Sequence, residues 1–155
     1  MAFGEYQSTL DERGRFALPL SLQELFAYTR PGAEKEVILL KGPGECIAIY
    51  NFPTWRQLLS KLRGEFDDDQ SRLFMHFIVS ECLTLEIDRS WRILIPRRFR
   101  EYAHLDSQII VVSLDDHLAI WDSKNLNRYL VTAQKKEEHI EEKKFLTREK
   151  DTSIV

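Results

Sequence analysis

Two Asp-x-x-x-Arg sequences, one from Asp11 to Arg15 and one from Asp88 to Arg92, each lead into a short apolar run. The guanidinium group carries a planar fork of donors that fits phosphate oxygens and the edge of guanine. An aspartate at this spacing closes a tight turn through its own side chain. A single pair of this kind is often only a surface ion pair worth about 0–1 kcal/mol. Because the pattern is repeated, we interpret Arg15 and Arg92 as binding groups and the two aspartates as groups that shape the turns.

Strand alternation predicts that both arginines face outward. Phe16 and Leu18 share one side of a predicted strand at 15–18, which leaves Arg15 on the other side. The same alternation places Arg92 on the outer side of its strand and Ile93 on the inner side. We therefore expect the apolar side of each strand to enter a core while the guanidinium groups remain accessible.

The two patterns lie in a duplicated unit. Residues 10–19 align with residues 87–96, with the Asp, Arg and Pro positions coinciding and the apolar positions matching in kind. Two further blocks correspond in the same order, 37–40 with 109–112 and 47–50 with 118–121. Agreement across three separate blocks indicates two copies of one structural unit.

Each copy has the pattern of a strand, a turn, a second strand, a short helix, a β-hairpin and a longer helix. Gly14 suits the positive φ of the first turn. In the first copy we predict a helix from Pro19, strands at 37–41 and 46–50, and a helix from Pro53 that stops at Gly64. In the second copy we predict a helix from Pro96, strands at 109–113 and 118–121, and a helix near 123–132.

The predicted organisation has four parts. The first repeat covers residues 1–68, a connecting helix capped by Asp69 covers 69–81, and the second repeat covers 82–132. Residues 133–155 form a charged tail that is helical or disordered, because it has few residues to bury.

Composition narrows the class of protein. A chain of 155 residues with 43% hydrophobic and 30% charged residues suits one globular domain or two small halves. Its two cysteines argue against a disulfide scaffold and a four-ligand zinc site, and no apolar run is long enough to cross a membrane. We therefore expect a cytoplasmic protein without metal or cofactor. The net charge of −3 argues mildly against nucleic-acid binding, but five arginines and no acid lie between Arg89 and Arg100.

Two other functional classes fit parts of this pattern. Paired aspartates in pseudo-symmetric halves suggest an aspartic-protease-like hydrolase, but an arginine beside each acid keeps it ionised, which is the wrong state for sharing a proton. The second alternative is a non-catalytic scaffold or antitoxin-like module in which the arginines hold protein subunits together. Catalysis is the less favoured of the two.

The segments 3–6, 10–15 with Pro19, and 87–96 resemble the MraZ family of bacterial transcriptional regulators of the division and cell-wall gene cluster. The resemblance covers about residues 3–132. It implies an α+β, mainly β fold, with two pseudo-symmetric halves like the swapped-hairpin barrels of AbrB and MazE, flanked by short helices.

The resemblance also implies a function. Members form ring-shaped oligomers that bind repeated short boxes of double-stranded DNA upstream of their own operon, which predicts a nucleoid-associated protein. Their DNA-contacting arginines fall on Arg15 and Arg92, and their motif acids fall on Asp11 and Asp88. We expect Arg13 and Arg89 to add phosphate contacts.

One position departs from the family pattern. Trp91 stands where members carry glycine, and a bulky residue disfavours positive φ. We therefore expect the second turn to differ in shape from the first. Trp91 either stacks on a base or sugar or packs on a neighbouring subunit, and packing is the favoured interpretation.

Overall fold

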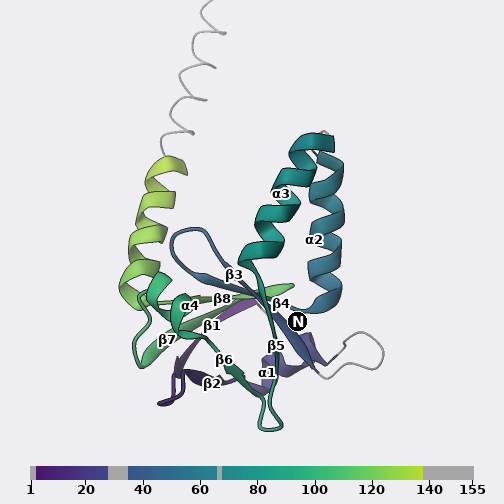
Figure 1. The fold of residues 1–155 in the computed structure, drawn as a ribbon. Coiled ribbons are helices and arrows are strands. Elements are labelled where there is room, and N and C mark those ends of the chain that lie inside the picture. The colour runs from purple at the N-terminus through teal and green to yellow at the C-terminus, as the bar shows by residue number, and fades with distance from the viewer. Residues whose placement is uncertain (1–2, 28–34, 66–67, 138–155) are drawn as a thin grey trace, which may run out of the picture. The chain divides into compact units, whose positions relative to one another are not determined.

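The computed structural model describes residues 3–27, 35–65 and 68–137 (Figure 1). Its strands are β1 (Phe3–Thr9), β2 (Arg15–Ala17), β3 (Glu36–Lys41), β4 (Ile47–Tyr50), β5 (Leu83–Glu86), β6 (Arg92–Leu94), β7 (Gln108–Leu114) and β8 (His117–Trp121). Its helices are α1 (Leu20–Gln23), the 3-10 helix η1 (Glu24–Phe26), α2 (Phe52–Glu65), α3 (Asp68–Glu81), α4 (Arg97–Tyr102) and a helix at 123–137. The chain divides into two compact units, and the helix at 123–137 begins the second unit.

Strands from the two repeats interleave in both sheets. The larger sheet has the order β1-β7-β8-β4-β3-β5, and β2 pairs with β6 in a separate two-stranded ribbon. The first repeat supplies β1 to the second repeat's β7, and the second repeat supplies β5 to the first repeat's β3. All six pairings are antiparallel. Replacing each strand of the larger sheet by its counterpart in the other repeat gives the same strand order, read from the other edge of the sheet.

The strand register locates the pseudo-two-fold axis. Ala48 lies opposite Ala119 in the β4–β8 pair, and Phe16 lies opposite Ile93 in the ribbon. The members of each pair hold equivalent positions in the two repeats, so both pairs lie on the axis. The α+β class and the pseudo-symmetric halves predicted from the sequence are confirmed. Each half contributes one strand that pairs with a strand of the other half at an edge of the larger sheet.

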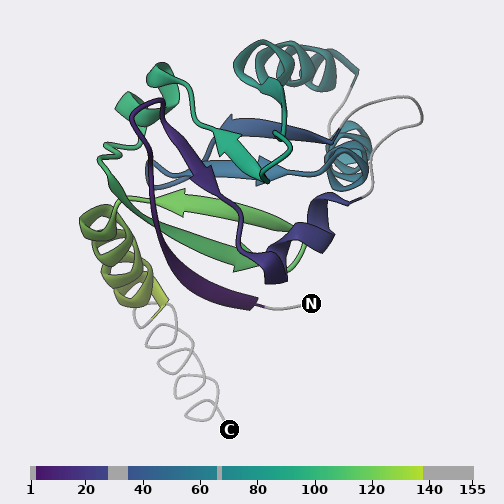
Figure 2. The same cartoon turned by 90° about the horizontal axis from the view of Figure 1, so that it is seen from below.

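A single core fills the space between the six-stranded sheet and the ribbon. The ribbon lies below the sheet in Figure 1 and in front of it in Figure 2. Phe16 and Ile93 point from the ribbon into this core, where they join buried residues from both repeats. Burial of one such side chain stabilises the fold by roughly 1.5–3 kcal/mol. The two repeats thus share one core.

Short helices follow the ribbon in both repeats. Pro19 precedes α1 and Pro96 precedes α4, and each proline carbonyl accepts a hydrogen bond from the backbone N–H three residues later. Proline suits this site because its fixed φ is compatible with helix entry. Both prolines were expected at the first helical position, and they stand one residue before it.

Two predicted helix boundaries were wrong by about one residue. Helix α2 continues through Gly64 to Glu65, since a glycine inside a helix lowers stability without ending it. Helix α3 begins at Asp68, so Asp69 lies in the first turn and is not the cap. A carboxylate there still interacts favourably with the helix dipole.

The helix at 123–137 is longer than the predicted 123–132, and its residues 134–137 are exposed. The remainder of the predicted tail, 138–155, lies outside the described residues. Within the described part of the chain, no helix is long and apolar enough to cross a membrane.

Candidate nucleic-acid interface

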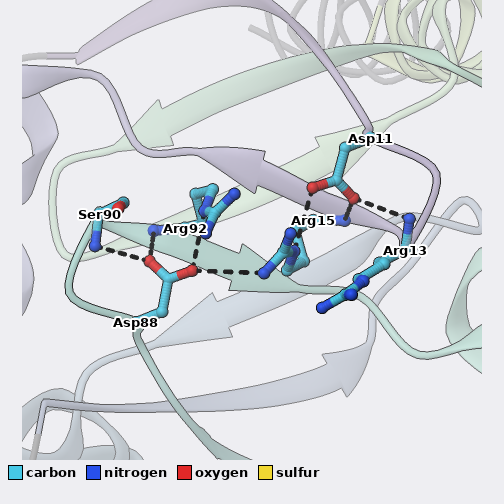
Figure 3. A network of polar contacts seen from close by, with 6 residues as sticks. All are labelled: Asp11, Arg13, Arg15, Asp88, Ser90 and Arg92. Atoms are coloured by element: carbon cyan, nitrogen blue, oxygen red, sulfur yellow. Dashed lines mark hydrogen bonds and ion pairs between the residues drawn. The ribbon is translucent and has the colours of Figure 1, made fainter.

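The first Asp-x-x-x-Arg turn is closed by the carboxylate of Asp11 (Figure 3). Its Oδ1 accepts hydrogen bonds from the backbone N–H groups of Arg13 and Arg15, each at 2.9 Å. Its Oδ2 accepts a hydrogen bond from Nε of Arg15 at 3.0 Å. The backbone N–H of Gly14 donates to the carbonyl of Asp11 at 3.0 Å. One side chain therefore shapes the turn and orients the arginine.

The second turn reproduces the first, contact for contact. Oδ1 of Asp88 accepts from the backbone N–H groups of Ser90 at 2.9 Å and Arg92 at 2.8 Å. Oδ2 of Asp88 accepts from Nε of Arg92 at 2.8 Å. The backbone N–H of Trp91 donates to the carbonyl of Asp88 at 3.0 Å. Arg92 is thus held in the same way as Arg15.

The expectation that Trp91 alters the second turn was wrong. Trp91 adopts φ 58°, in the same left-handed region as Gly14 at φ 84°. The Asp88 hydrogen bonds fix the backbone on both sides, and the carbonyl of Trp91 accepts from the N–H of Leu18 at 2.8 Å. A non-glycine residue in this region carries a strain of about 1–3 kcal/mol.

The side chain of Trp91 packs within its own chain. It is half-buried against the core, and Nζ of Lys35 lies 3.7 Å from the centroid of its ring. Cation–π contacts at partly exposed sites contribute about 0.5–1 kcal/mol. These contacts offset part of its backbone strain, and they lie within one chain rather than on the neighbouring subunit that the sequence suggested.

Pairing of β2 with β6 places both binding arginines on one surface. Arg15 lies opposite Leu94, and Arg92 lies opposite Ala17. Paired residues point to the same face of a ribbon, so Arg15 and Arg92 share the outward face while Phe16 and Ile93 face the core. The arginine side chains are 24% and 38% exposed. We call this outward surface, formed by Arg15, Ala17, Arg92 and Leu94, the ribbon face.

An ion pair also links the two turns. Nη1 of Arg15 lies 3.7 Å from Oδ2 of Asp88, so Asp88 contacts the arginines of both repeats (Figure 3). Spacing along the sequence gave no signal for this contact, because it depends on the register between β2 and β6. Asp11 makes no corresponding ion pair with Arg92 among the described residues, so the network is not symmetric.

Both motif carboxylates are held in the ionised form. The backbone N–H of Arg15 lowers the pKa of Asp11 against a smaller opposing effect of desolvation. Desolvation is the largest single influence on Asp88 and raises its pKa, but the hydrogen bonds from Arg92 and Ser90 together lower it below the usual 3.8. Two ionised carboxylates cannot share a proton, which argues against aspartic-protease chemistry.

Arg13 and Arg89 occupy the exposed tips of the turns. They are not equivalent in the repeat, because Arg13 aligns with Ser90 and Arg89 aligns with Glu12. Neither makes an ion pair with another residue that the structure describes. The turns that carry them lie at opposite ends of the β2–β6 ribbon, because the two strands run antiparallel.

The arginines of α4 have mostly structural contacts. Nε of Arg97 pairs with Glu101 at 2.9 Å, and Nε of Arg100 donates to the carbonyl of Ile95 at 3.0 Å. A Cβ at Gly14 would lie 2.9 Å from Nε of Arg100 and 3.0 Å from the Ile95 carbonyl oxygen. Gly14 is therefore required by this close packing as well as by its positive φ.

Across 3–27, 35–65 and 68–137, no group of three or more His, Cys, Asp or Glu side chains is arranged to hold a metal ion. The groups that the structure does bring together are guanidinium groups held by carboxylates. The duplicated fold and its paired turns define a class of proteins in which two repeats build one arginine-bearing surface.

Comparison with known proteins gives that class a family. The chain matches the family model described as "MraZ protein, putative antitoxin-like" over residues 1–77 and again over 78–148. The chain belongs to the MraZ family, as the motif resemblance predicted. The Transcriptional regulator MraZ of Acetivibrio thermocellus is 32% identical over 144 residues, 92% of this chain and 96% of the relative. The protein of that name from Moorella thermoacetica is 32% identical over 130 residues, 83% of this chain and 86% of the relative.

These relatives are named as regulators and not as enzymes. The comparison supports a role in transcriptional regulation for this chain. It agrees with the prediction that the protein is not an enzyme.

Proposed function

We propose that this protein is a sequence-specific DNA-binding regulator that contacts double-stranded DNA through its ribbon face. The observation that carries the proposal is the placement of Arg15 and Arg92 on one surface, each oriented by an aspartate. Arg13 and Arg89, exposed at the turn tips, would add contacts to phosphates.

A two-stranded ribbon suits the major groove of DNA, which is wide enough to admit one. Each aspartate occupies the Nε donor of its arginine. The terminal nitrogens are left for a guanine edge or a phosphate, apart from Nη1 of Arg15, which lies 3.7 Å from Oδ2 of Asp88. An arginine that is already oriented loses less side-chain entropy on binding. A bidentate contact with guanine discriminates against a wrong base by about 1–3 kcal/mol.

One ribbon face offers few contacts, so we propose that binding is multivalent. Copies of the chain assemble into a closed ring and bind repeated short boxes upstream of the division and cell-wall operon. Linking several weak sites raises the overall affinity by about 10²–10⁴. A net charge of −3 is compatible with this binding. Several weak contacts act together, and screening by salt leaves only the local charges to act at each contact. The protein would then act in the cytoplasm at the nucleoid.

We further propose the division into repeats at 1–68 and 82–132, joined by a connecting segment at 69–81 and followed by a tail at 133–155. The alignment of the two turns and the exchange symmetry of the strands support the two repeat segments.

The test is binding of DNA from upstream of the protein's own gene, measured by fluorescence anisotropy. Arg15→Ala and Arg92→Ala should each lower the affinity about tenfold or more, with light scattering showing unchanged assembly. Arg97→Ala is the matched control, because Arg97 pairs with Glu101 outside the ribbon face. Wild-type affinity in both ribbon variants would contradict the proposal. Loss of assembly in them would favour the scaffold or antitoxin-like alternative.

A further inference from the structure

One branched apolar side chain, Leu94, lies on the ribbon face beside the proposed binding arginines. Its neighbours in the chain, Ile93 and Ile95, are fully buried and point into the core. Strand alternation therefore turns Leu94 outward, where it is partly exposed and takes no part in the core. A single exposed leucine is ordinary on a protein surface, so any role of Leu94 comes from the surface on which it lies.

Leu94 lies directly opposite Arg15 in the pairing of β2 with β6. The Cβ atoms of opposed residues are about 4.5–5.5 Å apart. Successive base pairs of DNA follow one another at about 3.4 Å. When Arg15 contacts a guanine in the major groove, Leu94 therefore reaches the neighbouring base pair. A polar and an apolar contact are thus brought to adjacent positions of the DNA.

The backbone that follows Leu94 is fixed by two hydrogen bonds. The N–H of Ile95 donates to the carbonyl of Gly14 at 2.8 Å, and the carbonyl of Ile95 accepts from Nε of Arg100 at 3.0 Å. These bonds tie Leu94 to the turn that carries Arg15. A side chain whose backbone is held before binding loses less entropy on contact, which suits it to detect a single methyl group.

The major groove offers one apolar group to such a side chain, the C5 methyl group of thymine. The other base edges carry hydrogen-bond donors and acceptors, and a leucine placed against them removes water without replacing its hydrogen bonds. We propose that Leu94 recognises the methyl group of a thymine next to the guanine that Arg15 contacts. This inference rests on the proposed function, because it takes the ribbon face as the surface that contacts DNA.

The equivalent position in the first repeat carries a much smaller side chain. Ala17 holds the place of Leu94 in the repeat and lies opposite Arg92. One end of the ribbon face therefore presents an arginine with a leucine, and the other end presents an arginine with an alanine. A DNA site with two-fold symmetry does not match both ends equally. The box that the ribbon face reads therefore has a direction, with its thymine at the Arg15 end.

The test compares thymine with deoxyuridine, which differs in the base only by lacking the C5 methyl group. In a duplex taken from upstream of the protein's own gene, each thymine is replaced in turn, and fluorescence anisotropy measures the affinity of the full-length chain. One replacement should lower the wild-type affinity about fourfold, the effect of one buried methyl group. The same replacement should leave the affinity of Leu94→Ala unchanged.

A second base replacement locates the contact. The base 7-deazaguanine lacks the N7 acceptor to which an arginine donates. At the guanine that Arg15 contacts, it should weaken binding of the wild-type chain and leave binding of Arg15→Ala unchanged. That guanine should lie in the base pair next to the sensitive thymine. A separation of two or more base pairs would contradict the cross-strand placement of Leu94 beside Arg15.

Leu114→Ala is the matched control, since Leu114 is an exposed leucine of β7 outside the ribbon face. It should distinguish thymine from deoxyuridine as the wild type does, and so should Leu94→Met, which keeps an apolar side chain of similar length. Circular dichroism checks that each variant is folded.

Two results would overturn the inference while leaving the proposed function intact. One is a wild-type chain that binds the duplex but responds to none of the deoxyuridine replacements. The other is discrimination that survives in Leu94→Ala. A wild-type chain that does not bind the duplex at all would contradict the proposed function, and the inference with it.

Discussion

Nη1 of Arg15 lies 3.7 Å from Oδ2 of Asp88, an acid that belongs to the other repeat. Asp88 also accepts a hydrogen bond from Nε of Arg92, so this carboxylate holds both proposed binding arginines. Asp11 holds Arg15 alone. The two motif acids occupy equivalent positions in the repeats, but Asp88 contacts two arginines and Asp11 contacts one.

This asymmetry predicts unequal effects of two matched variants on DNA affinity. Asp88→Asn should weaken binding more than Asp11→Asn, because it releases Arg92 and also removes one contact of Arg15. The difference should reach up to about fivefold, the equivalent of about 1 kcal/mol for one further exposed ion pair. Fluorescence anisotropy on one DNA site measures both. Equal losses would show that the link between Arg15 and Asp88 contributes nothing.

Stability should depend on pH through the same two carboxylates. Their pKa values in the folded state lie below the 3.8 of the unfolded chain, so folding favours the charged form. Their contribution is fully present well above pH 3.8 and is lost as the pH falls through the folded-state values. Thermal melts should therefore show a decline in Tm below about pH 4. In Asp88→Asn the decline should be shallower, and an identical acid profile would contradict this assignment.

Two glycine substitutions should have opposite signs. Gly14→Ala should lower the free energy of unfolding by about 1–3 kcal/mol, because Gly14 has φ 84° and its new Cβ would meet a backbone oxygen at 3.0 Å. Gly64→Ala is the control, because it lies in α2 with open space around the new Cβ. It should raise stability by about 0.5–1 kcal/mol. Urea unfolding measures both, and stabilisation by Gly14→Ala would refute the required left-handed turn.

A variant on the pseudo-axis tests whether the repeats share one core. Phe16 is 1% exposed and lies opposite Ile93 of the other repeat. Phe16→Ala should lower the free energy of unfolding by about 3–5 kcal/mol. Hydrogen exchange should show reduced protection in β4 and β8 together. Loss confined to the first repeat would mean that the halves fold separately.

Local patterns predicted much of this fold. Turn residues and apolar alternation identified the ribbon strands, and the prolines marked the entry of α1 and α4. These features depend on neighbours in the chain, and a single sequence contains them. The outward direction of Arg15 and Arg92 followed from the same alternation.

Features that depend on distant residues were not predictable in this way. The structure exposes Leu73 and Phe77 on α3, and the spacing of apolar residues along a helix does not say what covers them. Trp91 kept its left-handed conformation because contacts from Asp88 and Leu18 outweigh its intrinsic preference. The ion pair between Arg15 and Asp88 required the register of two strands from different repeats.

The exchange of strands between repeats also has a consequence during synthesis. Among the strands that the structure describes, β1 pairs with β7 alone, and Tyr6 lies opposite Val111 in that pair. When β1 leaves the ribosome, it has no partner strand until β7 follows about one hundred residues later. Contacts this distant in sequence slow folding and leave strand edges open meanwhile. We therefore expect the nascent chain to depend on chaperones until its last strands emerge.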